Sequence, residues 1–363
     1  MLYLIIMKVG IYSPYLDSFG GGERYMLTIA EALASAHQVN LFVDQHHISL
    51  GPEKLKSDLA TRFNLDLSRV NLVKAPLGRG GNFFKRLLLL NNYDLFFYLT
   101  DGSLFYATSG TNIIHFQVPF KNTINRNLWG KMKLSSWDLA ICNSKFTQSV
   151  IEKEWPLKCK VVYPPVAVDE IKPLVKKKQI LSVGRFASFS KSKKHEEMIN
   201  AFRDLYDAGR VEGWGLCLAG SVEGDASYVE ELKKMAENIP VTFYPNCPFN
   251  KLVKLYGESS IYWHAAGLKE DDPVKMEHFG ITTVESMAGG CVPIVINKGG
   301  QTEIVENKHS GFLWDSIGEL KNLTVKVIND NKLMSELSKN AILRSKIFSK
   351  SEFVKQIQEI INV

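Results

Sequence analysis

Short apolar runs alternate with segments of helical spacing along this chain, and this alternation is the feature that most constrains the fold. The first series opens with an apolar run at residues 9–12, continues through a glycine-rich turn, and reaches a segment at 25–36 whose apolar residues recur on one helical face. Further strands in this half are expected at residues 39–43, 94–99, 112–116 and 139–142. Alternating strands and helices favour a parallel sheet with helices on both faces.

A break in the pattern near residues 164–178 indicates a domain boundary. Pro164 and Pro165 are followed by a lysine-rich stretch at 172–178, after which a second alternation begins. Its strands are expected at residues 179–183, 214–219, 241–244, 261–264 and 292–296, and its helices at 195–208, 228–238 and 283–289. A chain of 363 residues has room for two domains. We therefore expect an α/β protein with two doubly wound, Rossmann-like parallel-sheet domains and a ligand cleft between them.

The composition excludes several classes of protein. With 45% hydrophobic and 23% charged residues, the chain is neither disordered nor fibrous. The net charge of +6 is too small to indicate nucleic acid as a partner, but it suits anionic small molecules or an anionic membrane surface. The five cysteines are scattered and odd in number, which favours reduced thiols in a cytoplasmic protein over a disulfide framework or a zinc site. No apolar run approaches the ~20 residues of a membrane span.

The densest cluster of chemically useful residues lies at 277–290. Gly280 allows backbone to approach a ligand closely, and a helix capped by Thr282 or Thr283 is expected to follow it. The free N–H groups at such a helix start form an anion site suited to phosphate. Glu277 and Glu285 flank this site, where carboxylates would face hydroxyl groups. The alternative is that Thr282 and Glu285 form a capping box within their own helix, and that Glu277 is a solvated loop acid.

A second cluster, around Arg185 and Lys193, is basic. Arg185 follows the strand expected at 179–183, at the edge where open parallel sheets bind ligands, and Lys193 opens the next helix. A guanidinium and an ammonium that converge there would bind a diphosphate. The alternative for this region is a solvated basic loop.

The glycine-rich turn at Gly20–Gly22 supports a different interpretation. It resembles a dinucleotide fingerprint in which Tyr25 occupies the third glycine position, and Asp44 ends the second strand as a ribose-binding acid would. A dehydrogenase is therefore an alternative function.

Two histidines stand at the ends of expected strands. His115 and His264 are each preceded by apolar residues, and a lone histidine in such a place is more often structural than catalytic. No pair of aspartates has the D-x-D spacing of a metal site, and the acidic run at 270–272 fits a solvated loop. No metal site is expected.

Together these motifs resemble glycosyltransferase family 4, a group of retaining enzymes with the GT-B fold. The resemblance is dense from residue 183 to residue 305 and thinner, but present, in the first half. Its second-half motifs are the E-x7-E motif from Glu277 to Glu285, Val183-Gly184-Arg185-Phe186, Lys193, and Gly299-Gly300-Gln301-Thr302-Glu303. Its first-half motifs are Gly20–Glu23, His115, Asn143-Ser144 and Val162-Tyr163-Pro164-Pro165.

The resemblance implies that residues 169–344 bind a nucleotide-sugar donor and that residues 1–168 bind the acceptor, with a last helix from about residue 345 packed back onto the first domain. Arg185 and Lys193 would hold the donor diphosphate, Glu285 the ribose, and Glu277 the transferred sugar. His115 would reach the sugar from the first domain. The remaining donor contacts would come from Gly21, Gly22, Phe279, Gly280, Ile281 and Thr282.

The expected activity is that of a hexosyltransferase which keeps the anomeric configuration, needs no cofactor and binds its donor without a metal. The resemblance points to a GDP- or UDP-sugar donor and a glycan or lipid-linked acceptor. The segment that begins at Glu277 is similar to that of mannosyltransferases that extend lipid-linked oligosaccharides. Lys194, where the family often has glycine, and Trp263-His264, where many members have proline and serine, leave the donor open.

Other functions fit parts of the sequence. Basic and aromatic residues interleave at 121–133, including Arg126, Trp129, Lys131 and Lys133, which suits a protein peripheral to the cytoplasmic face of an anionic membrane. A membrane-bound scaffold without catalysis would show the same patch, and so would a solvated helix. A different GT-B enzyme, such as a nucleotide-sugar epimerase, would share the donor motifs.

Overall fold

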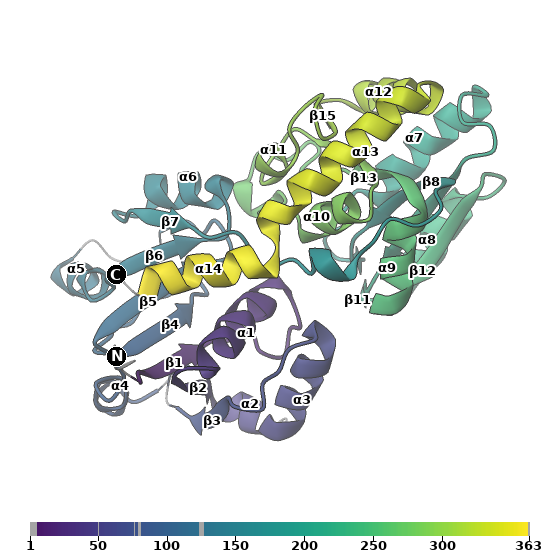
Figure 1. Cartoon of the computed structure of the whole chain (residues 1–363). Coiled ribbons are helices and arrows are strands. Elements are labelled where there is room, and N and C mark those ends of the chain that lie inside the picture. Colours follow the sequence, from purple (N-terminus) through teal and green to yellow (C-terminus); the bar gives the residue numbers. More distant parts are fainter. Residues whose placement is uncertain (1–5, 50, 76, 79–80, 123–126, 362–363) are drawn as a thin grey trace. The chain divides into compact units, whose positions relative to one another are not determined.

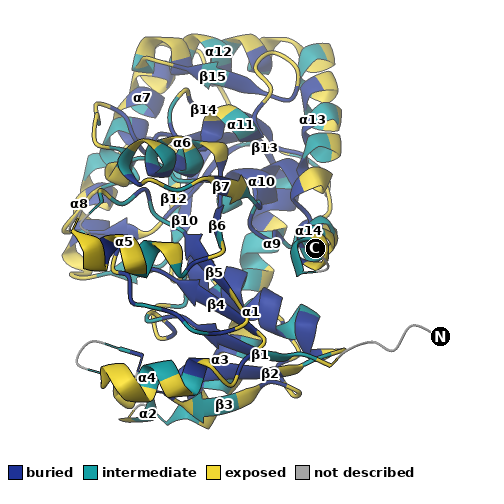
Figure 2. Cartoon of the chain, turned by 90° about the vertical axis from the view of Figure 1, so that its left-hand side faces the viewer, coloured by how far each residue is buried: buried dark blue, intermediate teal, exposed yellow. Residues whose placement is uncertain are grey.

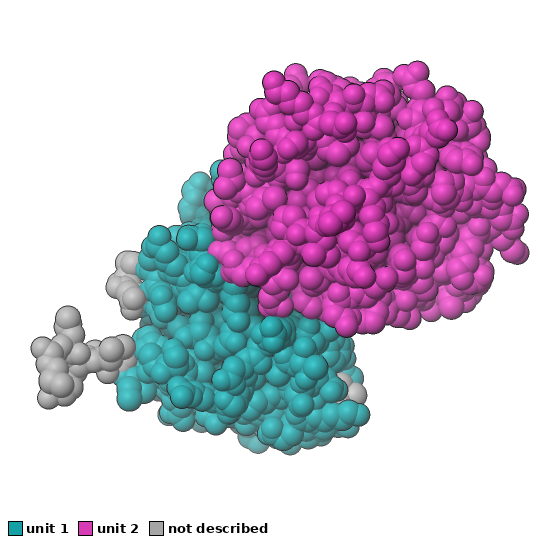
Figure 3. Space-filling model, turned by 45° about the vertical axis from the view of Figure 1, so that its right-hand side comes forward, with its two compact units in different colours: residues 1–165, 350–363 teal, residues 166–349 magenta. Residues whose placement is uncertain are grey.

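The computed structural model describes residues 6–49, 51–75, 77–78, 81–122 and 127–361 (Figure 1). The chain divides into two compact units, shown in different colours in Figure 3. Unit 1 comprises residues 1–165 and 350–363, and unit 2 comprises residues 166–349. The sequence places the first boundary after residue 168, three positions from the division at Pro165.

Unit 1 is built on a parallel sheet. Within the described residues this sheet has seven strands, in the order β3-β2-β1-β4-β5-β6-β7. The strands are β1 (Lys8–Tyr12), β2 (Gln38–Val43), β3 (Asn71–Lys74), β4 (Leu95–Leu99), β5 (Thr111–Phe116), β6 (Leu139–Cys142) and β7 (Cys159–Val161). Every strand predicted for this half is present, and the short edge strands β3 and β7 were not predicted.

Helices cover both faces of this sheet. They are α1 (Gly21–Ala34), α2 (Gln45–Ser49), α3 (Pro52–Phe63), α4 (Phe83–Leu90), α5 (Leu128–Ser135), α6 (Lys145–Glu154) and α14 (Lys350–Ile361). One core lies under α1, α3 and α14, and the other lies under α4, α5 and α6. The predicted apolar face of α1 is confirmed, since Met26, Ile29 and Ala30 are fully buried.

The last helix, α14, belongs to unit 1 although the chain reaches it from unit 2. Its Phe353 packs edge-on against Tyr25 of α1, with ring centroids 4.7 Å apart. Lys350 Nζ lies 2.6 Å from the Glu31 carboxylate of the same helix. An apolar contact and an ion pair therefore both join α14 to α1.

Unit 2 repeats the architecture. Its described main sheet has six parallel strands in the order β12-β10-β8-β13-β14-β15, beside a small sheet of β9 and β11. The strands are β8 (Lys177–Val183), β9 (Phe186–Ala187), β10 (Gly215–Gly220), β11 (Val222–Glu223), β12 (Val241–Pro245), β13 (Ser259–His264), β14 (Val292–Ile296) and β15 (Phe312–Trp314). The helices are α7 (His195–Asp207), α8 (Ser227–Met235), α9 (Phe249–Glu258), α10 (Ile281–Ala288), α11 (Gln301–Ile304), α12 (Ile317–Asn329) and α13 (Asn331–Ser345), with single 3-10 turns at Val168–Glu170, Pro273–Lys275 and Lys346–Phe348.

The strand order of unit 2 contains a topological switch point. From β8 the chain proceeds outward through β10 to β12, and it then returns to the other side of β8 as β13. The loops that follow β8 and β13 therefore diverge at the carboxyl edge of the sheet, where open α/β sheets bind ligands. In unit 1 the corresponding switch point lies between β1 and β4.

The helices in the described part of the chain include none that is both long enough and apolar enough to span a bilayer. The apolar run at 87–90 forms the second half of α4, an eight-residue helix.

Candidate functional site

The start of α10 is set by Gly280. This residue has φ 124°, in a region that side chains other than glycine rarely adopt, and it is the N-cap of the helix. A Cβ at this position would also collide with the Gln301 amide and lie 3.2 Å from Ile304 Cδ1. The prediction that Thr282 or Thr283 caps the helix is wrong, because the positive φ that turns the chain occurs earlier. The first-turn N–H groups, which have no acceptor within a helix, begin at Ile281.

The proposed capping box between Thr282 and Glu285 is also absent. The Glu285 carboxylate instead accepts a hydrogen bond of 2.8 Å from the hydroxyl of Tyr256, on the neighbouring helix α9. The Tyr262 hydroxyl, on β13, donates to Thr282 Oγ1 at 2.8 Å. Two tyrosines therefore fix the side chains that flank the helix start, and neither side chain serves as a cap.

Glu277 is paired with a lysine from a distant part of the sequence. Lys193 Nζ donates to Glu277 Oε2 at 2.6 Å, and the two side chains are only 21% and 19% exposed. Burial by itself raises the pKa of Glu277, but the charge of Lys193 and the hydrogen bond from His264 outweigh it and hold this pKa well below its usual range. Glu277 is therefore ionised at neutral pH and is not the solvated loop acid of the alternative interpretation.

His264, at the end of β13, is the third member of this cluster. Its Nε2 lies 3.0 Å from Glu277 Oε2 and donates to it, because an ionised carboxylate only accepts. Burial lowers the pKa of His264 despite the neighbouring carboxylate, so the ring is neutral near pH 7. A neutral imidazole that donates through Nε2 fixes the orientation of Glu277 without adding charge.

Gly184 makes room for the lysine of this cluster. A Cβ at Gly184 would lie 2.8 Å from Lys193 Cγ, which is closer than real Cβ contacts come. Glycine at this position therefore lets the Lys193 side chain pass over the end of β8 toward Glu277. The glycine next to Arg185 in the sequence motif has a direct packing role.

Arg185 lies at the same edge of the sheet but does not touch Glu277. Its Nη1 donates to both carboxylate oxygens of Glu223, at 2.9 and 3.2 Å, and its side chain is 63% exposed. Exposed pairs of this kind contribute about 0–1 kcal/mol. An anion that arrives at the helix start can therefore replace Glu223 as the partner of Arg185 at little cost.

Two further glycines support the loop that carries Glu277. Gly299 has φ 61°, and the N–H of Gly300 donates to the Glu277 carbonyl at 2.8 Å. Phe279, at the centre of the loop, is buried and packs edge-on against Phe348. Gln301 follows in α11, fully buried, and no protein group in the described part of the chain satisfies either polar atom of its amide.

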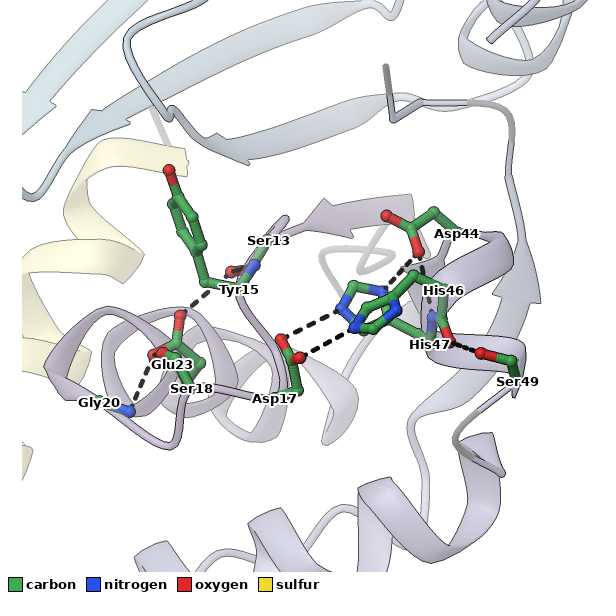
Figure 4. Close-up of polar contacts among 10 residues, drawn as sticks. All are labelled: Ser13, Tyr15, Asp17, Ser18, Gly20, Glu23, Asp44, His46, His47 and Ser49. Atoms are coloured by element: carbon green, nitrogen blue, oxygen red, sulfur yellow. Dashed lines mark hydrogen bonds and ion pairs between the residues drawn. The ribbon is translucent and has the colours of Figure 1, made fainter. Parts of the chain in front are cut away.

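The glycine-rich turn of unit 1 is organised by Glu23 (Figure 4). Its carboxylate accepts from the Gly20 N–H at 2.9 Å and from the Ser18 and Ser13 hydroxyls at 2.7 and 3.3 Å. Burial raises the pKa of Glu23, although these hydrogen bonds favour its charged form. Gly21 and Gly22 form the first turn of α1, and a Cβ at Gly22 would lie 3.0 Å from Leu99. A carboxylate thus occupies the place where a dinucleotide fingerprint would hold a pyrophosphate.

Asp44, the residue that supports the dehydrogenase alternative, is engaged locally. Its Oδ1 accepts from the His47 N–H at 3.1 Å at the start of α2, and His47 Nδ1 lies 3.1 Å from the same oxygen. Asp17, from the loop after β1, lies 2.9 Å from His46 Nε2 (Figure 4). Asp44 therefore holds the start of α2, and the contact with the loop after β1 is made by His46.

His115 is closed off within unit 1. It is fully buried, its ring stacks on Tyr25 at 3.9 Å between centroids, and its Nε2 lies 2.9 Å from Gln117 Oε1. Burial lowers the pKa of His115 to about 4. The contact with a transferred sugar that the resemblance implies stays a prediction.

The site of unit 2 thus unites Lys193, Glu277 and His264 and fixes Thr282 and Glu285 beside them. The sequence motifs do not include Tyr256, Tyr262 or Glu223, and they include Gln301 without giving it a role. At the β8–β13 switch point, the carboxylates of this site can bind hydroxyl groups. Its basic side chains and the start of α10 can bind an anion.

Known proteins match this region. Residues 168–344, just under half of the chain, match the family model described as "Glycosyl transferases group 1". The protein named GDP-Man:Man(3)GlcNAc(2)-PP-Dol alpha-1,2-mannosyltransferase from Candida glabrata is 24% identical over 352 residues, which cover 79% of this chain and 68% of that protein. The protein of the same name from Xenopus laevis is 34% identical over 199 residues, which cover 50% of this chain and 39% of that protein.

Solved structures share the fold over nearly the whole length. A glycosyltransferase from Rickettsia africae has a TM-score of 0.76 at 17% identity and covers 98% of both chains. Anabaena HepE in complex with UDP has a TM-score of 0.72 at 18% identity and covers 98% of this chain and 100% of that one. The predicted fold class, GT-B with two Rossmann-like domains, is confirmed.

Proposed function

We propose that this chain is a retaining glycosyltransferase of family 4 that transfers a sugar from a nucleotide-sugar donor to a glycan or lipid-linked acceptor. The observation that carries the proposal is the cluster of Lys193, Glu277 and His264 beside the start of α10. This cluster lies at a ligand-binding edge and inside the segment that matches the group 1 glycosyl transferases. GDP-mannose is the first donor to test, because the curated relatives from Candida glabrata and Xenopus laevis carry GDP-Man in their names.

To bind the diphosphate of the donor, basic side chains must leave their carboxylate partners and turn to the phosphate groups. Lys193 has a flexible four-carbon stem and is held by Glu277, and the exposed Arg185 is held by the partly exposed carboxylate of Glu223. Both side chains and the N–H groups near Thr282 can turn to a diphosphate whose charge grows as the sugar leaves. Losing one such preorganised group typically costs about 10²–10³ in rate.

The two glutamates are suited to bind hydroxyl groups. Glu277 is held ionised and oriented by Lys193 and His264, so it can accept hydrogen bonds from the transferred sugar. Glu285 is oriented by Tyr256, and we propose that it accepts hydrogen bonds from the ribose of the donor. Neither carboxylate needs to act as a nucleophile, and we propose front-face attack by the acceptor, with the leaving phosphate as the base.

Donor binding without a metal follows from the same charges. Because Arg185, Lys193 and the helix start supply the positive potential, a chelator should leave donor affinity unchanged. The proposed location is the cytoplasmic face of a membrane, where a lipid-linked acceptor would lie. An inactive scaffold would have no need of a buried, charged Lys193–Glu277 pair, and the activity assay below separates the two functions.

The test is thermal unfolding with a panel of GDP-, UDP- and ADP-sugars, with chelator present. A ligand at 100 times its dissociation constant adds about 2.7 kcal/mol of stability. A shift with one nucleotide class that is lost in Arg185→Ala supports the proposal. If no sugar nucleotide raises the unfolding temperature and NAD does, the result would favour a dehydrogenase. Donor conversion without acceptor would indicate an epimerase.

A further inference from the structure

Two short helices of unit 1 expose an unusual number of large apolar side chains. On α4, Phe83, Phe84 and Leu88 are 46%, 71% and 70% exposed. On α5, Leu128, Trp129 and Met132 are 72%, 68% and 40% exposed. An exposed Leu alone needs no explanation, but six large apolar side chains exposed on two helices of one surface mark an interaction surface.

The two helices belong to one face of the unit. Both pack on the segment between β4 and β5, where the Thr108 hydroxyl donates to the Leu87 carbonyl of α4 at 2.8 Å. From the other side, the Ala107 N–H donates to Ser136 Oγ, just after α5, at 3.0 Å. Figures 1 and 2 both place α4 and α5 on the same side of unit 1, and Figure 2 shows exposed residues on each. We call this the α4–α5 face.

The charge of the α4–α5 face has one sign. Residues 74–93 and 102–137 contain no aspartate or glutamate. Lys85 on α4 and Lys131 on α5 are exposed, and Lys133 is partly so. None of these three lysines pairs with a carboxylate among the residues that the structure describes. Arg126, which the sequence analysis included in this basic stretch, lies outside the described residues.

We propose that the α4–α5 face docks onto an anionic lipid bilayer. Amphipathic helices that combine lysine with Trp, Phe and Leu lie in the bilayer interface, with apolar side chains below the headgroups and basic ones among them. Exposed Trp129 and Phe84 supply the apolar anchors, and Lys85 and Lys131 supply the attraction to anionic headgroups. The proposal rests on unit 1 alone and uses no residue of the proposed donor site.

The charge also argues against a second copy of this chain as the occupant. A twofold dimer would bring the same surface of each copy together. The lysines of one copy would then meet the lysines of the other, with no carboxylate on α4 or α5 to offset them. A helix that only faces solvent would carry polar side chains at these positions, in place of Phe84, Leu88 and Trp129.

The test is co-sedimentation of the full chain with vesicles of phosphatidylcholine, with and without phosphatidylglycerol. We expect binding to the anionic vesicles that weakens with salt, because exposed charges are screened. The double variant Lys85→Glu/Lys131→Glu should reduce the partition coefficient more than about tenfold. Phe84→Ser/Trp129→Ser should reduce it by a similar factor and should remove the blue shift of tryptophan emission that we expect on binding.

Matched controls come from residues outside the α4–α5 face. Lys54→Glu reverses an exposed lysine on α3, which covers the opposite face of the same sheet, and Phe189→Ser removes an apolar residue of unit 2 that is 77% exposed. Both should bind vesicles like the wild type. A cooperative thermal unfolding transition without ligand, at the wild-type midpoint, shows that each variant is folded, and this readout does not depend on the proposed function.

Three outcomes would overturn the proposal. One is no binding of the wild type to either vesicle, and another is equal loss of binding in the control variants. The third is a wild-type dimer in solution that Phe84→Ser/Trp129→Ser dissociates, which would assign the α4–α5 face to a second copy. If the serine variant does not fold, the lysine variant carries the test, since it changes exposed side chains only.

Discussion

The pair of Lys193 and Glu277 gives a prediction whose size follows from the structure. Removing one partner of a fully buried ion pair costs about 3–5 kcal/mol, because the other charge is left in a poorly solvated place. Here the side chains are 21% and 19% exposed, so water reaches them and we expect about 2–3 kcal/mol for Lys193→Met. Glu277→Gln should cost less, since Gln can still accept hydrogen bonds from both Lys193 and His264.

The two variants and their combination form a double-mutant cycle. We expect a coupling energy of about 1–2 kcal/mol from urea unfolding at pH 7, so that the double variant is more stable than the sum of the singles predicts. Turnover should behave differently. Each single variant should lose about 10²–10³ in rate, and the double variant should recover none of it, because both groups are needed for the donor.

Acid should erase the stability difference. The pKa of Glu277 is depressed in the folded protein, so the stabilisation is present above its ordinary value of 4.5 and is lost as the pH falls toward the folded pKa. The gap between wild type and Lys193→Met should therefore shrink below about pH 4.5. Additive stabilities at pH 7, or near-normal turnover in either single variant, would refute the reasoning.

Three other predictions concern the surroundings of the site. Tyr256→Phe removes the hydrogen bond to the buried Glu285 carboxylate and should cost about 1.5–3 kcal/mol in urea unfolding; a loss under 0.5 kcal/mol would contradict it. Gly184→Ala should push Lys193 aside, cost about 1–3 kcal/mol and weaken donor binding in a thermal-shift titration, whereas unchanged affinity would show that this packing is unimportant. Burial lowers the pKa of His195 to about 3, so below pH 7 the unfolded chain binds more protons than the folded one. The free energy of unfolding should therefore fall by about 2 kcal/mol between pH 7 and pH 5. His195→Phe should flatten this pH dependence in urea unfolding, and an unchanged slope would contradict the prediction.

The strands were the most predictable part of the fold. Every strand predicted from an apolar run is present, since buried parallel strands are nearly continuous in apolar residues. The edge strand β3 was not predicted because its residues are half-buried or exposed and have no such run. The exposure of Leu88, in the apolar run at 87–90, could not be predicted either, because it depends on tertiary packing.

The site was predictable in its charged residues and not in its geometry. Glu277, Glu285, Arg185 and Lys193 stand in motifs of recognisable spacing, but the contact between Lys193 and Glu277 joins positions 84 residues apart. The sequence predicts a lone structural histidine at His264, because its partner Glu277 follows only after a loop.

The cap of α10 could not be read from residue types. A threonine followed three positions later by a glutamate is a typical capping pattern. In the folded protein, however, both side chains have tyrosine partners. Those tyrosines lie on α9 and β13, and nothing in the local sequence of 280–289 indicates them. The actual start is determined by the positive φ of Gly280.

The measurement that tests the central claim most directly is transfer itself. The chain is incubated with GDP-mannose, and in parallel with UDP- and ADP-sugars, together with a lipid-linked oligosaccharide, and the acceptor is analysed by mass spectrometry and its new linkage by NMR. The account predicts an acceptor that gains one hexose from one nucleotide class, with the anomeric configuration of the donor retained and the rate of transfer lowered about 10²–10³-fold in Glu277→Gln. An acceptor that gains no sugar from any donor, or a product formed equally well by Glu277→Gln, would contradict it.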